Sequence, residues 1–100
     1  MAAAVAMLPL WDLRSERGGV LSRAFVFHDF AQAMAFMTQA AFHARLCDHH
    51  PEWLNVCNRV CVTLTTHDIG GISPRSVALA QVMDRIAATL DGQAQGAIRP

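Results

Sequence analysis

The strongest constraint on the fold is a stretch, residues 30–47, that contains neither glycine nor proline. Alanine, methionine, glutamine and phenylalanine dominate it, and most of these residues favour helices. Asp29 precedes the stretch, where its carboxylate can cap the first turn, and Pro51 follows and excludes a continuation. One long helix is therefore predicted over residues 30–47. Its expected buried stripe, at spacings of three and four, consists of Phe30, Met34, Met37, Ala41 and Ala44.

A pair of strands is expected before this helix. They are residues 11–15 and residues 20–27, of which the second segment is rich in β-branched and aromatic side chains, and Gly18-Gly19 between them is typical of a turn. Because side chains alternate along a strand, Arg23, Phe25 and Phe27 are predicted to share one face. These segments predict a hairpin.

A second pair of strands and a second helix are expected after it. Residues 53–57 and 59–66 flank Asn58, and the second of these segments alternates between Val or Leu and Cys or Thr. Ser73 can then cap a helix over residues 74–90, which begins with proline.

The predicted order is therefore β-β-α-β-β-α. Hairpins separated by helices imply an α+β fold, in which a four-stranded antiparallel sheet has the helices packed on one face. With no repeat or linker in the sequence, residues 1–100 are expected to form one domain with a core over about residues 11–90.

Composition restricts the function classes. Eight basic and eight acidic side chains cancel, so no concentrated positive charge favours direct binding of nucleic acid. Only 16% of the residues are charged while 53% are apolar, which leaves apolar surface for a second copy of the chain to cover. A homo-oligomer is therefore expected.

The same composition indicates a compartment. The longest apolar runs are too short to span a membrane, and the apolar start lacks the basic residues of a signal peptide. The cysteines, Cys47, Cys57 and Cys61, are odd in number and lack C-x-x-C spacing, which favours reduced thiols. A cytoplasmic location is expected.

Three of the five histidines are candidates for chemistry. His49 and His50 end the long helix, and His67 ends the last strand. Imidazoles exchange protons near neutral pH and suit a reaction that needs both an acid and a base. A purely structural alternative is that His49 caps the helix and His67 merely terminates a strand.

A metal site is a competing interpretation. Its candidate ligands are Cys47, His49, His50 and His67. No H-x-x-x-H or C-x-x-C pair places two ligands on one helical face, so a metal is not expected.

A longer pattern surrounds these histidines. Residues 48–56 read Asp-His-His-Pro-Glu-Trp-Leu-Asn-Val, residues 58–60 read Asn-Arg-Val and residues 64–68 read Leu-Thr-Thr-His-Asp. This pattern, in which His67 follows His50 by seventeen positions, resembles the pterin-4a-carbinolamine dehydratases. The likeness extends over about residues 11–90.

The resemblance implies a cytosolic α+β enzyme that dehydrates 4a-hydroxytetrahydrobiopterin to quinonoid dihydropterin in the recycling of tetrahydrobiopterin. It implies no metal and no cofactor, and a homodimer or tetramer. The implied catalytic residues are His49, His50 and His67. The implied pterin contacts are Asp48, His49, His50, Thr65, Thr66, His67 and Asp68.

Three positions depart from the family pattern. Arg45 stands where an acidic side chain is usual, Cys57 where an aromatic is usual, and Ser76 where many members carry aspartate. These departures keep a second hypothesis open. In it the chain is a catalytically inactive relative that binds a protein client, as a RuBisCO assembly factor or a transcription-factor dimerisation cofactor does.

Overall fold

A computed structural model of the chain describes residues 7–66 and 71–91. Its helices and strands follow the predicted order. They are β1 (Asp12–Arg14), the short 3-10 turn η1 (Glu16–Gly18), β2 (Val20–Val26), α2 (Phe30–Leu46), β3 (Glu52–Val56), β4 (Arg59–Leu64) and α3 (Pro74–Asp91). Each predicted helix or strand is present, with ends displaced by no more than two residues.

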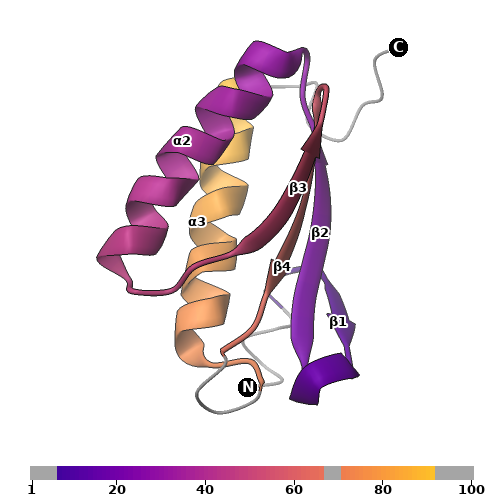
Figure 1. Cartoon of the computed structure of the whole chain (residues 1–100), viewed down its shortest axis with the longest axis vertical. Helices are drawn as coiled ribbons and strands as arrows, with labels where there is room; N and C mark the ends of the chain where they lie inside the picture. The colour runs from indigo at the N-terminus through magenta and orange to yellow at the C-terminus, as the bar shows by residue number, and fades with distance from the viewer. Residues whose placement is uncertain (1–6, 67–70, 92–100) are drawn as a thin grey trace.

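The strands form one antiparallel sheet in the order β1-β2-β4-β3. The central pair is β2 and β4, in which Phe25 lies opposite Val60. Both helices lie on one face of the sheet, side by side, as Figure 1 shows. The predicted α+β class is therefore confirmed. No helix among the described residues is long and apolar enough to cross a membrane.

The core lies between the sheet and the helices. Phe25 and Phe27 project from β2 and meet Phe36 of α2, with ring centroids 4.6 Å and 5.0 Å from that of Phe36. All three are fully buried. The predicted face of β2 is thus the core face.

Asp84 of α3 accepts two hydrogen bonds from residues on the sheet side of this core. Arg23 shares the core face of β2, and its Nη1 donates to Asp84 of α3 at 2.5 Å. The indole nitrogen of Trp11 donates to the same carboxylate oxygen at 2.8 Å. The buried guanidinium therefore joins the sheet to α3 by a charge-assisted hydrogen bond.

The predicted buried stripe of α2 is largely wrong. The residues of α2 that face the core are Ala33, Phe36, Ala40 and Ala44. Phe30 is 55% exposed and Met34 is 42% exposed. This helix is apolar on nearly every side, so more than one of its faces carries apolar residues at spacings of three and four. The face rich in alanine is the one that packs toward α3.

The connection between β1 and β2 also differs from the expected Gly-Gly turn. It spans residues 15–19, includes η1, and places Arg17, Gly18 and Gly19 at φ of 53°, 79° and 125°. Three consecutive residues with positive φ make a broader loop than a two-residue hairpin turn. This loop contacts the site described next.

Candidate functional site

The end of α2 places the two adjacent histidines. Asp48 adopts the left-handed conformation at φ 51°, and its N–H bonds to the Arg45 carbonyl at 3.1 Å. The N–H of His49 bonds to the Ala44 carbonyl at 3.0 Å. Together these bonds form a Schellman motif with aspartate in the position usually held by glycine.

This motif separates the two imidazoles. His49 is turned inward and is only 5% exposed, whereas His50 is exposed. Pro51 then leads into β3. The two adjacent histidines therefore differ in exposure: His49 is buried and His50 is accessible.

A pocket of about 390 Å³ lies beside these residues. Its volume falls within the range typical of small-molecule sites. The lining residues are Asp48, His49, His50, Pro51, Glu52, Thr65, Thr66 and Arg75. Five of the predicted site residues, Asp48, His49, His50, Thr65 and Thr66, are thus brought together.

Two residues that follow β4, Thr65 and Thr66, also line the pocket. Thr66 pairs with Gly71 through two backbone hydrogen bonds of 2.7 Å and 3.1 Å. Both Thr65 and Thr66 are buried. The predicted site residues His67 and Asp68, which follow Thr66 in sequence, lie outside the described residues.

A chain of buried hydroxyls leads to the ring of His49. Its Nε2 lies 3.3 Å from Ser76 Oγ, which lies 3.1 Å from Thr66 Oγ1. Thr66 Oγ1 in turn lies 2.6 Å from Ser73 Oγ. Ser76, one of the three departures from the family pattern, therefore contacts a predicted catalytic residue directly.

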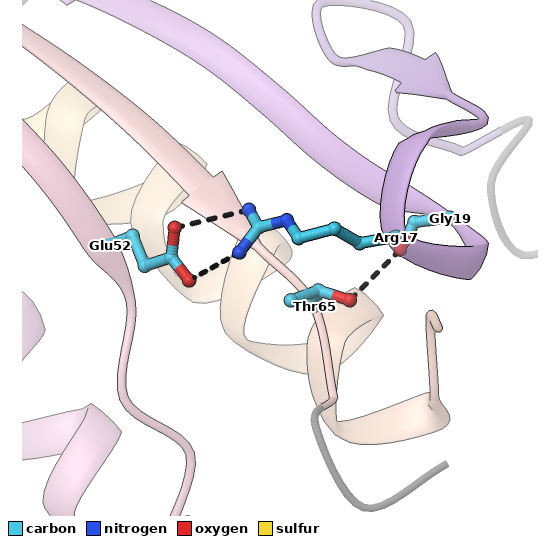
Figure 2. Close-up of polar contacts among 4 residues, drawn as sticks. All are labelled: Arg17, Gly19, Glu52 and Thr65. Carbon is cyan, nitrogen blue, oxygen red and sulfur yellow. Dashed lines mark hydrogen bonds and ion pairs between the residues drawn. The ribbon is translucent and has the colours of Figure 1, made fainter. Parts of the chain in front are cut away.

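The β1–β2 loop contacts two residues that line the pocket, Glu52 and Thr65. Figure 2 shows Arg17 reaching Glu52, with nitrogen–oxygen distances of 2.8 Å and 3.1 Å. The hydroxyl of Thr65 donates to the Gly19 carbonyl at 2.9 Å. The hydrogen bonds that Arg17 donates to Glu52, together with the negative charge of this carboxylate, raise the pKa of Arg17 above its ordinary value.

The loop also approaches the segment after β4. A Cβ added to Gly71 would lie 2.8 Å from the Gly18 carbonyl oxygen. Real Cβ atoms do not approach an oxygen so closely, so glycine is required at this position.

Three residues of the site were not predicted as such. Glu52 and Arg75 line the pocket, and Ser76 supports His49. Arg75 had a local signal in the sequence, because a cation in the first turn of a helix opposes the helix dipole. The role of Ser76 depends on the approach of two distant segments, which spacing along the chain does not reveal.

One candidate metal ligand, His67, lies outside the described residues. Within residues 7–66 and 71–91, no three side chains of His, Cys, Asp or Glu lie close enough to hold a metal ion. The described lining of the pocket offers proton donors and acceptors beside one buried and one exposed imidazole.

Comparison with known proteins identifies the family. A profile described as "Pterin 4 alpha carbinolamine dehydratase" matches residues 1–86. The chain belongs to this family. Two relatives, each named "Putative pterin-4-alpha-carbinolamine dehydratase", come from Rhizorhabdus wittichii and Novosphingobium aromaticivorans. They are 51% and 54% identical over 86 and 82 residues, which cover 86% and 82% of this chain and 88% and 84% of theirs.

Solved structures show the same dehydratase fold. A transcriptional coactivator/pterin dehydratase from Brucella melitensis superposes with a TM-score of 0.82 at 42% identity, covering 87% of this chain and 92% of that one. A pterin dehydratase-like protein identified as a RuBisCO assembly factor in the alpha-carboxysome gives a TM-score of 0.66 at 23% identity. That alignment covers 77% of this chain and 88% of that one, and shows the fold alone.

Proposed function

We propose that this protein dehydrates 4a-hydroxytetrahydrobiopterin to quinonoid dihydropterin, a step in the recycling of tetrahydrobiopterin. The observation that carries the proposal is the pocket in which buried His49 and exposed His50 lie beside Thr65 and Thr66, which follow β4. Membership of the dehydratase family supports the same reaction.

The chemistry requires two proton transfers at neighbouring atoms. The 4a-hydroxyl group takes a proton and leaves as water, while N5 loses its proton and forms a double bond to C4a. In the proposal His49 and His67 donate and accept these protons, and His50 helps to hold the pterin. Asp48, Thr65, Thr66 and Asp68 contribute polar contacts to the ring.

The departures from the family pattern are compatible with catalysis. Arg45 and Cys57 are both exposed, and neither lines the pocket. Ser76 is the departure closest to the chemistry, and it keeps a hydrogen-bonding partner on His49. Support for the alternative, an inactive relative that binds a protein client, therefore comes from two exposed positions, Arg45 and Cys57, and not from a disrupted pocket.

We also infer that the chain forms at least a dimer. The outer edge of β3 has no neighbouring strand among the described residues, and Leu54 on this strand is 64% exposed. An uncovered strand edge beside apolar side chains favours pairing with a second copy. Light scattering at micromolar concentration should give at least twice the chain mass, and a single monomeric mass would refute the inference.

The free cysteines support the cytoplasm as the site of action. All three cysteines are unpaired, and Cys57 is exposed at the β3–β4 turn. Exposed free thiols are kept reduced in the cytoplasm, whereas secreted domains tend to pair them.

The test of function is an assay with freshly generated carbinolamine. The purified full chain should accelerate appearance of quinonoid dihydropterin above the rate in buffer. A rate equal to that in buffer, together with capture of one specific protein by the same preparation, would favour the client-binding alternative.

A further inference from the structure

Ser76 is a buried serine at the start of α3, and its hydroxyl lies beside the ring of His49. It is the third residue of α3, is fully buried, and lies 3.3 Å from Nε2 of His49. The N–H of Ser73, which precedes the helix, donates to Ser76 Oγ at 3.3 Å. This is one half of a capping box, with a hydroxyl in place of the usual carboxylate or amide.

A chain of hydroxyls continues from Ser76. Thr66 Oγ1 lies between Ser76 Oγ and Ser73 Oγ, at 3.1 Å and 2.6 Å. All three hydroxyl-bearing side chains are buried. Each hydroxyl has one proton to donate and two lone pairs to accept with, so the possible directions of this chain can be enumerated.

In the first direction the protons point toward the histidine. Ser73 donates to Thr66, Thr66 donates to Ser76, and Ser76 donates to Nε2 of His49. Each of the three protons then has an acceptor. The two lone pairs of Ser76 are filled by the Ser73 N–H and by the Thr66 hydroxyl.

In the reverse direction the histidine donates to Ser76, Ser76 to Thr66, and Thr66 to Ser73. The hydroxyl proton of Ser73 then has no acceptor among the described residues. In any other arrangement in which the histidine donates, three hydroxyl protons share two hydroxyl–hydroxyl contacts, so one proton is again left without an acceptor among these residues. A buried hydroxyl without a partner is costly, so the first direction is favoured.

We propose that Ser76 fixes the tautomer of His49: the neutral imidazole accepts at Nε2 and carries its proton on Nδ1. Ser76 is thus a positioning residue, which acts through His49. The consequence for catalysis rests on the proposed function: the proton that neutral His49 can donate to the pterin is the one on Nδ1.

The serine at position 76, where many family members carry aspartate, has a physical consequence for His49. An ionised aspartate at this position is only an acceptor, so it would require a proton on Nε2. A serine can donate, which permits the opposite tautomer. Exchange of the two side chains should therefore exchange the protonated nitrogen.

The test is a long-range ¹H–¹⁵N spectrum of the histidine rings in the full chain, at a pH where the imidazoles are neutral. Loss of one set of signals in His49→Gln assigns His49. We expect the wild-type ring to show a protonated Nδ1 and an unprotonated Nε2. A protonated Nε2 in the wild-type spectrum would overturn the proposal, and this result needs no variant of Ser76.

Two variants of Ser76 extend the test. Ser76→Ala removes the donor, and we expect the ring to move toward the Nε2-protonated tautomer that free histidine prefers. Ser76→Asp should give a fully protonated Nε2. Ser22→Ala, on the open face of β2, is the matched control and should leave the pattern of His49 unchanged. An unaltered pattern in folded Ser76→Ala would contradict the proposal.

The spectra need no substrate, so the two proposals can fail separately. A protonated Nδ1 with no dehydratase activity would leave the tautomer assignment standing and refute the function. Activity with a protonated Nε2 would leave the function standing and refute the assignment.

Discussion

Arg17 and Glu52 form a two-pronged ion pair across thirty-five residues of sequence, with both guanidinium Nη atoms within 3.1 Å of a carboxylate oxygen. Glu52 lines the pocket, whereas Arg17 belongs to the loop between β1 and β2. The pair therefore connects a surface loop to the rim of the site.

Removal of this contact should weaken substrate binding more than turnover. In Arg17→Gln the carboxylate of Glu52 loses its ion pair with the guanidinium, and KM is expected to rise about two- to fivefold with little change in kcat. Arg14→Gln breaks the similarly exposed Arg14–Glu16 pair outside the pocket and should leave both constants unchanged. A fall in kcat with constant KM in Arg17→Gln would contradict this role.

The contribution of the Arg17 guanidinium to substrate binding should be the same at neutral and at moderately alkaline pH. Glu52 raises the pKa of Arg17, so the contribution of its charge is complete below the ordinary arginine pKa and is lost only as pH rises through the raised value. The ratio of KM in Arg17→Gln to KM in the wild type should therefore be equal at about pH 7 and about pH 9. A ratio that falls to one at the higher pH would show that the charge had been lost.

The buried face of α2 can be tested with two identical chemical changes. Phe36→Ala removes a fully buried ring and should lower the free energy of unfolding by about 3–5 kcal/mol in urea titrations. Phe42→Ala removes a ring that is 67% exposed and should lower it by less than about 1 kcal/mol. Equal losses of unfolding free energy in the two variants would mean that Phe42 is also buried. If the loss in Phe42→Ala depended on protein concentration, the ring would lie between subunits.

The left-handed residue before the histidine pair provides another test. At φ 51° Asp48 occupies a conformation that glycine adopts without cost and alanine does not. Asp48→Ala should therefore be less stable than Asp48→Gly by about 1 kcal/mol in urea unfolding. If the two variants were equally stable, the backbone at this position would not be under steric constraint.

The sequence was sufficient for the fold but not for every contact within it. Helix and strand positions follow from caps, prolines and alternation, which act locally. The cap at Asp29, the end of the helix before Pro51 and the strand that begins at Arg59 are therefore predicted correctly. The packing face of α2 was not, because Phe30 and Phe36 lie on faces of similar hydrophobicity and only the approach of α3 distinguishes them.

The candidate site shows the same division. Asp48, His49 and His50 are consecutive, and Thr65 and Thr66 end one strand, so the resemblance to a family was enough to group them. Ser76 reaches His49 from a separate helix, and Arg17 reaches Glu52 from a loop whose backbone departs from a simple turn. Such contacts depend on tertiary structure and leave no periodic signal in the sequence.

The most direct test of the account is the rate of carbinolamine dehydration by the wild type, His49→Gln and His43→Gln. His43 is an exposed histidine of α2 that does not line the pocket, so it controls for loss of an imidazole elsewhere. The account predicts acceleration by the wild type, a decrease of about 100-fold or more in His49→Gln, and no change in His43→Gln. Wild-type and His49→Gln rates that both equal the rate in buffer would contradict it.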